Sequence, residues 1–147
     1  MSALEKDLNP DTFIGLSFPI RRDDNNDFKL TKTSLEQAQH NLKNLFLTYP
    51  GERVGQPTFG SRIRELCFEQ IDDELPTRIE EEVRRTVSNW LPYINVQEVN
   101  TLNEEGDKNK IFVQVKYSTT LNPSTMESIT VDATYTGTID EATGYRT

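Results

Sequence analysis

Apolar residues recur along the first half of the chain with the spacing of an α-helix. The stripe starts after Thr33 and consists of Leu35, Ala38, Leu42, Leu45 and Phe46, which a helix places on one face. Thr33 and Glu36 form a capping box, in which each side chain can accept a hydrogen bond from a backbone N–H of the first turn. The pattern predicts a helix that begins at Thr33 and ends before Tyr49-Pro50-Gly51.

Two further helices are predicted downstream. The first is short, starts after Ser61, and has an inner face of Ile63, Leu66 and Cys67 that can extend to Phe68. The second begins near Pro76, because the first turn of a helix does not need the missing N–H, and ends at Pro92. Its apolar stripe is Ile79, Val83, Val87 and Trp90, and its opposite face of Glu80, Glu81, Glu82, Arg84 and Arg85 is expected to be solvated.

Beyond Pro92 the pattern changes to the alternation of β-strands. Residues 93–102 form the first predicted strand, and Val96 and Val99 fall on opposite faces of it, which indicates a bulge. Two later strands carry alternating apolar residues, namely Ile111, Val113, Val115 and Tyr117, then Ile129, Val131, Ala133 and Tyr135. The sequence predicts an α+β fold of about three helices followed by a three-stranded antiparallel β-meander.

The length of 147 residues suits one domain. We expect a flexible arm over residues 1–12, the domain over residues 13–136, and a polar tail over residues 137–147. The arm carries a turn signal at Asn9-Pro10-Asp11. The first segment of the domain, Phe13 to Ile20, is apolar, but its Gly and Pro stand too close together for a helix.

Composition narrows the possible partners. A net charge of −8 argues against nucleic acid, which is bound through clustered Lys and Arg. No apolar run approaches the roughly 20 residues that span a bilayer, so we expect no membrane partner. The first residues lack the layout of a signal peptide, and we expect a protein made and kept in a cytoplasm. With Cys67 as the single cysteine, no intrachain disulfide can form.

The inventory of chemically active residues is small. His40 is the single histidine, so one chain cannot assemble an ordinary zinc site, and we expect no metal, cofactor or small-molecule ligand. His40 is expected at the surface, and Cys67 is expected to pack as a small hydrophobe. Glycoside hydrolysis needs only two carboxylates, for which the candidates are Glu52, Glu69, Asp72, Asp73 and Glu74. A solvated acidic linker explains these acids better, and no catalytic residue is predicted.

Four blocks in fixed order carry a resemblance to a known family. They are Gly15-Leu16-Ser17-Phe18-Pro19-Ile20, then Gln39-His40-Asn41-Leu42-Lys43-Asn44-Leu45-Phe46-Leu47-Thr48, then Pro50-Gly51-Glu52-Arg53, then Pro57-Thr58-Phe59-Gly60. Together they resemble the small baseplate wedge family of contractile-tailed phages. That family includes the T-even wedge protein once labelled a baseplate lysozyme and its type VI secretion counterpart.

The resemblance implies a structural role in the virion, at the tail baseplate, with assembly in the host cytoplasm. It implies that the chain joins other baseplate wedge proteins, resembles the inner domain of the tail sheath protein, and templates the first sheath ring. Family members carry Glu-Pro-Arg after the Trp of the last helix, at a wedge contact. Here Trp90 is followed by Leu91-Pro92-Tyr93, so the contact at Trp90, Leu91, Pro92 and Tyr93 is expected to be apolar or aromatic.

The final predicted strand is a candidate for strand addition. Its outward positions are rich in Thr, and Asp132 is its single charge, which makes its edge a suitable template for an added strand. The candidate residues are Ile129, Thr130, Val131, Asp132, Ala133, Thr134 and Tyr135. The alternative is that residues 137–147 of the chain cover this edge themselves.

The loop between the first two helices is expected to shape the fold. Its glycines allow backbone conformations closed to other residues, and Arg53 is a candidate to bind a carboxylate within the fold. The loop-shaping residues are Gly51, Glu52, Arg53, Phe59 and Gly60.

Three functions are compatible with these patterns. The first, and the prediction we favour, is a wedge protein that binds other wedge proteins and templates the sheath through strand addition. The second is a muramidase of the baseplate, which would need a carboxylate pair in a cleft with one raised pKa. The third is a sheath-like or tube-like protein, although the chain lacks long extended arms that would lock identical copies together.

Overall fold

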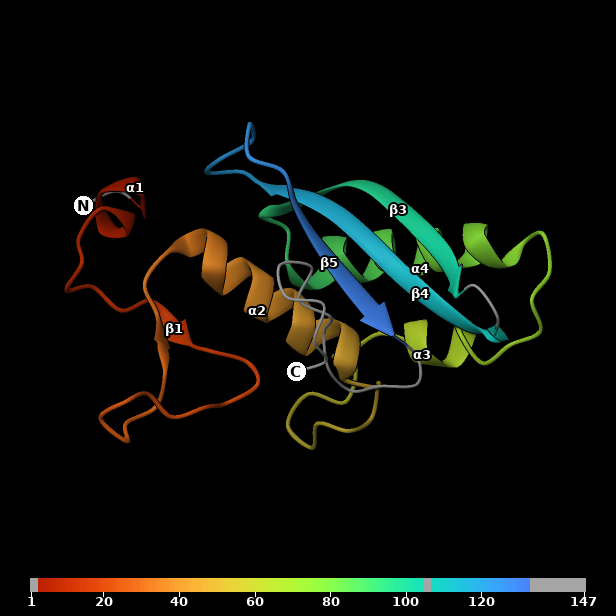
Figure 1. Cartoon of the computed structure of the whole chain (residues 1–147), viewed down its shortest axis with the longest axis horizontal. Helices are drawn as coiled ribbons and strands as arrows, with labels where there is room; N and C mark the ends of the chain where they lie inside the picture. Colours follow the sequence, from red (N-terminus) through yellow and green to blue (C-terminus); the bar gives the residue numbers. More distant parts are fainter. Residues whose placement is uncertain (1–2, 105–106, 133–147) are drawn as a thin grey trace.

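The computed structural model describes residues 3–104 and 107–132 and has the predicted α+β architecture. The helices are α1 (Ala3–Asp7), α2 (Ser34–Leu47), α3 (Ile63–Leu66) and α4 (Leu75–Trp90). The strands are β1 (Gly15–Leu16), β2 (Leu30–Thr31), β3 (Ile94–Glu104), β4 (Asp107–Thr119) and β5 (Glu127–Asp132). Figure 1 shows α2, α3 and α4 beside the three long strands, whereas α1 stands apart from them at the N-terminal end. None of the helices within the described ranges is long and apolar enough to cross a membrane.

The main sheet is antiparallel and has the strand order β3-β4-β5. Val96 of β3 pairs with Tyr117 of β4, and Glu98 pairs with the next residue, Lys116, so Gln97 is an extra residue in β3. The bulge indicated by Val96 and Val99 is therefore confirmed. The extra residue shifts the alternation of inward and outward side chains in β3 by one position, while the pairing with β4 continues on both sides of the bulge.

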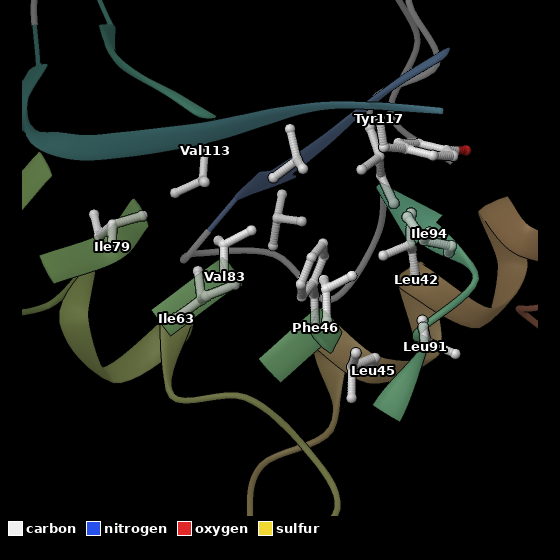
Figure 2. Close-up of a cluster of buried hydrophobic side chains, with 14 of the residues drawn as sticks. Leu42, Leu45, Phe46, Ile63, Ile79, Val83, Leu91, Ile94, Val113 and Tyr117 are labelled. Carbon is white, nitrogen blue, oxygen red and sulfur yellow. The ribbon is translucent and has the colours of Figure 1, made fainter. Parts of the chain in front are cut away.

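The core lies between the inner face of this sheet and the helices. Helix α4 packs against β3, and α2 packs against β5 and α3. In Figure 2, Val113 points from β4 towards Ile79 and Val83 of α4. The predicted stripes of the two long helices supply Ala38, Leu42, Leu45 and Phe46 of α2 and Ile79, Val83 and Val87 of α4 to the core. Leu35, Leu66 and Trp90 are partly buried at the border of the core.

The capping interactions explain where the two long helices begin. Thr33 is the N-cap of α2, and its hydroxyl accepts a hydrogen bond from Glu36 N–H at 3.2 Å. In a regular capping box the Glu36 carboxylate would accept from the N–H of the N-cap residue, Thr33. Here its Oε2 accepts from the N–H of the preceding residue, Lys32, at 3.1 Å. Pro76 stands in the first turn of α4, and Leu91 is the C-cap, as the proline signals predicted.

One prediction for the second helix is wrong. Helix α3 ends at Leu66, and Cys67, its C-cap, is buried as expected. Phe68 does not continue the inner face, since 68% of its surface is exposed. The physical reason is the length of the helix, because a single turn cannot place a residue beyond its end on the same stripe.

The N-terminal segment is attached to α2 at two points. The carboxylate of Asp7, the last residue of α1, accepts hydrogen bonds from Ser34 N–H at 2.9 Å and Ser34 Oγ at 2.8 Å. His40 Nδ1 lies 3.0 Å from Phe18 N and 2.8 Å from Phe18 O. His40 was expected at the surface, but it is half-buried, because the segment around Phe18 covers it.

Candidate interaction surfaces

Strand β5 is an edge of the main sheet. It pairs with β4 through Val131 opposite Val113 and Ile129 opposite Val115, and within the described ranges no strand pairs with its other side. Ile129 and Val131 are buried on the inner face, while Thr130 is half-buried on the outer face. Of the other strand-addition candidates, Asp132 ends β5, and Ala133, Thr134 and Tyr135 lie outside the described residues.

The opposite edge, β3, differs because α4 engages its backbone. Arg84 donates from Nη1 to the carbonyl of Val96 at 2.9 Å and from Nη2 to that of Gln97 at 3.4 Å. Glu80 orients the same guanidinium through an ion pair of 2.8 Å. Two carbonyls at the bulge are thus occupied within the chain, and bulges themselves discourage further pairing at an edge.

We expect the Arg84→Ala substitution to lower the free energy of unfolding by about 1–2 kcal/mol, because it removes charge-assisted hydrogen bonds to the bulge carbonyls. Chemical denaturation would measure the change. Arg21→Ala is the matched control, since it deletes the same side chain at an exposed position, and it should cost no more than about 0.5 kcal/mol. Equal losses for the two variants would contradict the role given to Arg84.

The loop between α2 and α3 brings two groups of predicted residues together. Gly51 and Gly60 adopt positive φ angles of 100° and 129°. Arg53 lies over the ring of Phe59, with its guanidinium carbon 3.9 Å from the ring centroid, and no ion pair of Arg53 is found among the described residues. Phe59 contacts Trp90 edge-on, with ring centroids 5.2 Å apart. The loop is thereby joined to the end of α4.

The residues that follow Trp90 are only partly accessible. Leu91 is buried, whereas Pro92 and Tyr93 are exposed. Tyr93 Oη accepts a hydrogen bond from Asn41 Nδ2 of α2 at 2.7 Å. An outside partner at this segment would therefore meet the Pro92 ring and the Tyr93 side chain, which α2 holds in place.

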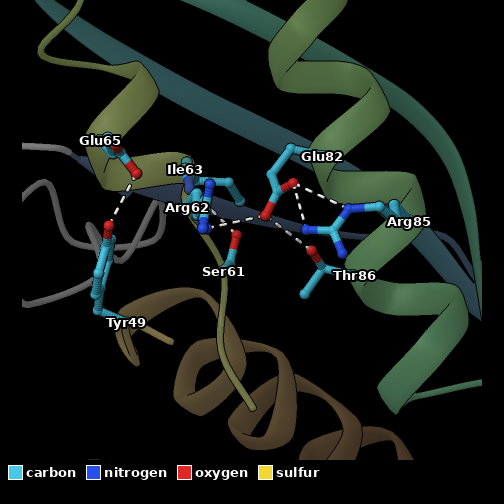
Figure 3. A network of polar contacts seen from close by, with 8 residues as sticks. All are labelled: Tyr49, Ser61, Arg62, Ile63, Glu65, Glu82, Arg85 and Thr86. Carbon is cyan, nitrogen blue, oxygen red and sulfur yellow. Dashed lines mark hydrogen bonds and ion pairs between the residues drawn. The ribbon is translucent and has the colours of Figure 1, made fainter. Parts of the chain in front are cut away.

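A polar network fixes the start of α3 against α4 (Figure 3). Glu82 Oε1 accepts hydrogen bonds from Arg62 N–H at 2.9 Å and Thr86 Oγ1 at 3.2 Å, and Arg85 pairs with its other oxygen. On the other side of α3, Tyr49 Oη donates to Glu65 Oε2 at 2.9 Å, which raises the pKa of Tyr49. The side chain of Glu82 is only 11% exposed, so the expectation of a fully solvated outer face for α4 was wrong at this residue.

The acidic residues considered for hydrolysis have structural partners. Glu69 and Asp72 both pair with Arg78, each at 3.0 Å, and Glu52 Oε2 accepts from Tyr49 N–H at 2.9 Å. Asp73 and Glu74 are exposed. None of these acids lines the grooves that are described below. In the part of the chain described, no three His, Cys, Asp or Glu side chains stand together as a metal site would require.

A surface that sequence reasoning missed lies on the N-terminal hairpin. Phe13, Leu16, Phe28 and Leu30 are 56%, 47%, 59% and 38% exposed. They line a groove of about 730 Å³ whose remaining lining is Asp23, Asn25, Asp27, Lys29 and Lys32. A cluster of exposed apolar side chains is typical of a contact surface. The signal in the sequence was the apolar segment around Leu16, but periodicity could not show that its side chains stay uncovered.

An α+β domain whose β5 edge has no partner strand among the described residues, and which exposes a cluster of apolar side chains, has features of proteins that bind neighbours in an assembly. Residues 33–124 match the model of the family described as Baseplate wedge protein gp25. This range covers well over half of the chain, which therefore belongs to the baseplate wedge protein gp25 family. The resemblance found in the four sequence blocks is thus confirmed.

Two solved structures share the fold. A Geobacter sulfurreducens protein, provisionally called a tail lysozyme and solved at 1.44 Å, is 22% identical with a TM-score of 0.62, covering 71% of this chain and 93% of that chain. A chain of the baseplate of the anti-feeding prophage, from a six-fold symmetrised cryo-EM structure, is 24% identical with a TM-score of 0.64, covering 71% and 82%. A comparison with curated proteins gave no match. The family makes this chain a baseplate wedge component of a contractile tail or injection system.

Proposed function

We propose that this wedge protein acts by binding its neighbours and not by catalysis, and that it templates the first ring of the tail sheath by strand addition to β5. The observation that carries the proposal is the difference between the two sheet edges. The side of β5 away from β4 has no partner strand among the described residues, whereas Arg84 of α4 occupies carbonyls of β3 at its bulge. Main-chain hydrogen bonds at an open edge supply affinity for an extended segment.

We assign the contacts with other wedge proteins to a second region, the segment Trp90–Tyr93. The aromatic contact between Phe59 and Trp90 makes the segment rigid, and Pro92 and Tyr93 are exposed beside it. Such a surface suits an apolar or aromatic partner, since neither charge of the family's Glu-Pro-Arg is present. The exposed apolar side chains on the N-terminal hairpin further support burial of this protein within an assembly.

The muramidase alternative comes from the old label of a wedge-family member, and the Geobacter structure carries a similar name. Its carboxylate candidates in this chain serve other purposes, since Glu69 and Asp72 hold Arg78 and Glu52 binds the backbone of Tyr49. Glycosidases place their two carboxylates on either side of a bound sugar. Nothing in the contacts of these acids favours that use, and we therefore propose no enzymatic activity.

Co-purification and amide hydrogen exchange test the proposed function together. The tagged chain should co-purify with the wedge proteins and the first-ring sheath subunit of its own particle. On sheath binding, amides of β5 between Glu127 and Asp132 should exchange at least tenfold more slowly, while those of β3 around Gln97 should stay unchanged. Protection of β3 and not β5 would contradict templating at β5. Failure to bind any wedge or sheath subunit, together with measurable peptidoglycan cleavage, would favour the enzyme.

A further inference from the structure

A second groove lies between the first turns of α2 and the beginning of β5, next to the edge proposed for strand addition. Its volume is about 220 Å³. The lining residues are Thr33, Leu35, Glu36 and Gln39 of the α2 side and Tyr117 and Glu127 of the sheet. The groove is thus built from two elements that meet only in the tertiary structure.

Tyr117 is the unusual member of this lining. Its side chain is fully buried, yet its hydroxyl has no hydrogen-bond partner among the described residues. In Figure 2 the ring leaves the apolar cluster and carries its oxygen away from the core. A buried hydroxyl without a partner is costly and uncommon. The groove therefore contains a polar atom that a bound group could satisfy.

The charge of the groove selects the kind of group that fits. Glu36 and Glu127 contribute two carboxylates, Gln39 contributes an amide, and no Lys, Arg or His of the described residues lines the space. Glu36 also accepts from the backbone of Lys32, whereas no ion pair engages Glu127 within the described residues. Carboxylates with an amide and a hydroxyl oxygen offer several acceptors to an ammonium or guanidinium group, and they repel an anion.

The position of Glu127 relates the groove to the edge of the sheet. Glu127 pairs with Tyr117 and is the first residue of β5. Alternate residues of a strand share a face, so Glu127 lies on the same inner face as Ile129 and Val131. A strand added beside β5 would place one inward side chain next to Glu127, at the mouth of the groove.

We propose that this groove receives one lysine or arginine side chain from the strand that pairs with β5, and that this contact sets the register of the added strand. The inference rests on the proposed strand addition at β5 and specifies its partner. Main-chain pairing alone fixes register weakly, because shifts by two residues preserve the faces of both strands. A single cation in an acidic groove removes this ambiguity.

Binding of the purified first-ring sheath subunit to charge variants tests the proposal. Glu127→Lys should lower the affinity at least about tenfold, since it replaces an attraction by a repulsion at a close contact. The matched control is Glu81→Lys, the same change at an exposed position of α4, which should alter affinity by less than about twofold. Tyr117→Phe should weaken binding about threefold or more and leave the unfolding midpoint unchanged or raised, because it removes only the unpaired hydroxyl.

Charge exchange identifies the partner residue. Each Lys and Arg of the sheath segment that pairs with β5 is replaced by Glu, and one of these variants should restore binding to the Glu127→Lys chain. If Glu127→Lys binds sheath as tightly as Glu81→Lys does, the groove has no such occupant, while strand addition at β5 stands. If the unchanged chain binds wedge proteins but no sheath subunit, the templating proposal fails and this inference fails with it.

Discussion

Replacing Phe46 by alanine is expected to lower the free energy of unfolding by about 3–5 kcal/mol. Phe46 lies on the α2 stripe and is completely buried. Its removal forfeits the burial of an aromatic ring and leaves a cavity between α2 and the sheet, which the surrounding helices can close only in part. Denaturation by urea, monitored by circular dichroism, would measure the loss as a lower midpoint with an unchanged slope.

Phe68→Ala is the matched control for this prediction. It deletes the same side chain where 68% of the surface is exposed, and it should cost no more than about 0.5 kcal/mol. If Phe46→Ala fails to fold, Phe46→Leu gives a measurable version, with an expected loss of no more than about 1.5 kcal/mol. A loss at Phe68 equal to that at Phe46 would mean that Phe68 has a covering partner within the free protein.

The second large effect is expected at Gly60. The Gly60→Ala substitution should lower the free energy of unfolding, measured by urea denaturation, by about 2–4 kcal/mol. Gly60 has a φ of 129°, and a Cβ there would stand 2.5 Å from Thr48 O and 2.9 Å from Pro50 N. These are backbone atoms, which cannot turn aside as a flexible side chain would. The same contact region holds the hydrogen bond from Ser61 N–H to Thr48 O at 2.9 Å, so the substitution also disturbs the return of the loop to α2.

Substitutions at two other glycines distinguish the effect of backbone strain from the effect of the steric clash. Gly51 has a φ of 100°, but a Cβ there would meet nothing within 4 Å, so Gly51→Ala should cost only the conformational strain of about 1–2 kcal/mol. Gly55 has neither the positive φ nor a close neighbour, and Gly55→Ala should change stability by no more than about 0.5 kcal/mol. Losses at Gly60 no greater than those at Gly51 would contradict the steric part of the argument.

The stability variants also help to interpret the binding tests, because a substitution can weaken binding either by unfolding the protein or by removing a contact. Gly60 and Phe59 stand in the loop that supports Trp90, so a substitution at either can weaken wedge binding by unfolding the support. Variants at Glu127 and Glu81 delete no apolar core side chain, since Glu81 is exposed and Glu127 is half-buried beside the groove. Comparing their unfolding midpoints with those of the loop variants separates loss of fold from loss of contact.

Much of the architecture could be predicted because its signals are local. The capping box at Thr33 and the proline at position 76 depend on neighbouring residues, and both mark helix starts in the structure. The bulge could be predicted because Val96 and Val99 cannot share a face of a regular strand. The family was recognisable for a similar reason, since ordered blocks of residues need no tertiary information.

The surfaces could not be predicted in the same way. Periodicity separates inner from outer faces but does not give strand order, so the sequence could not tell that Arg84 would reach the β3 bulge while β5 remained an edge. It also treats every charged outer position as solvated, although Glu82 is nearly enclosed where α3 meets α4. Contacts between residues far apart in sequence decide these environments.

The sequence by itself determined which segments are helices and strands, which stripes form the core, and which family the chain joins, because propensity, capping and alternation act over a few residues. Only the tertiary structure decided that His40 is covered by the segment around Phe18, that Arg53 stacks on Phe59, and that Tyr117 and Glu127 share a groove with α2. Each of these contacts forms because segments that are far apart in the sequence pack together. The free energy of that packing cannot be recognised from a few neighbouring residues.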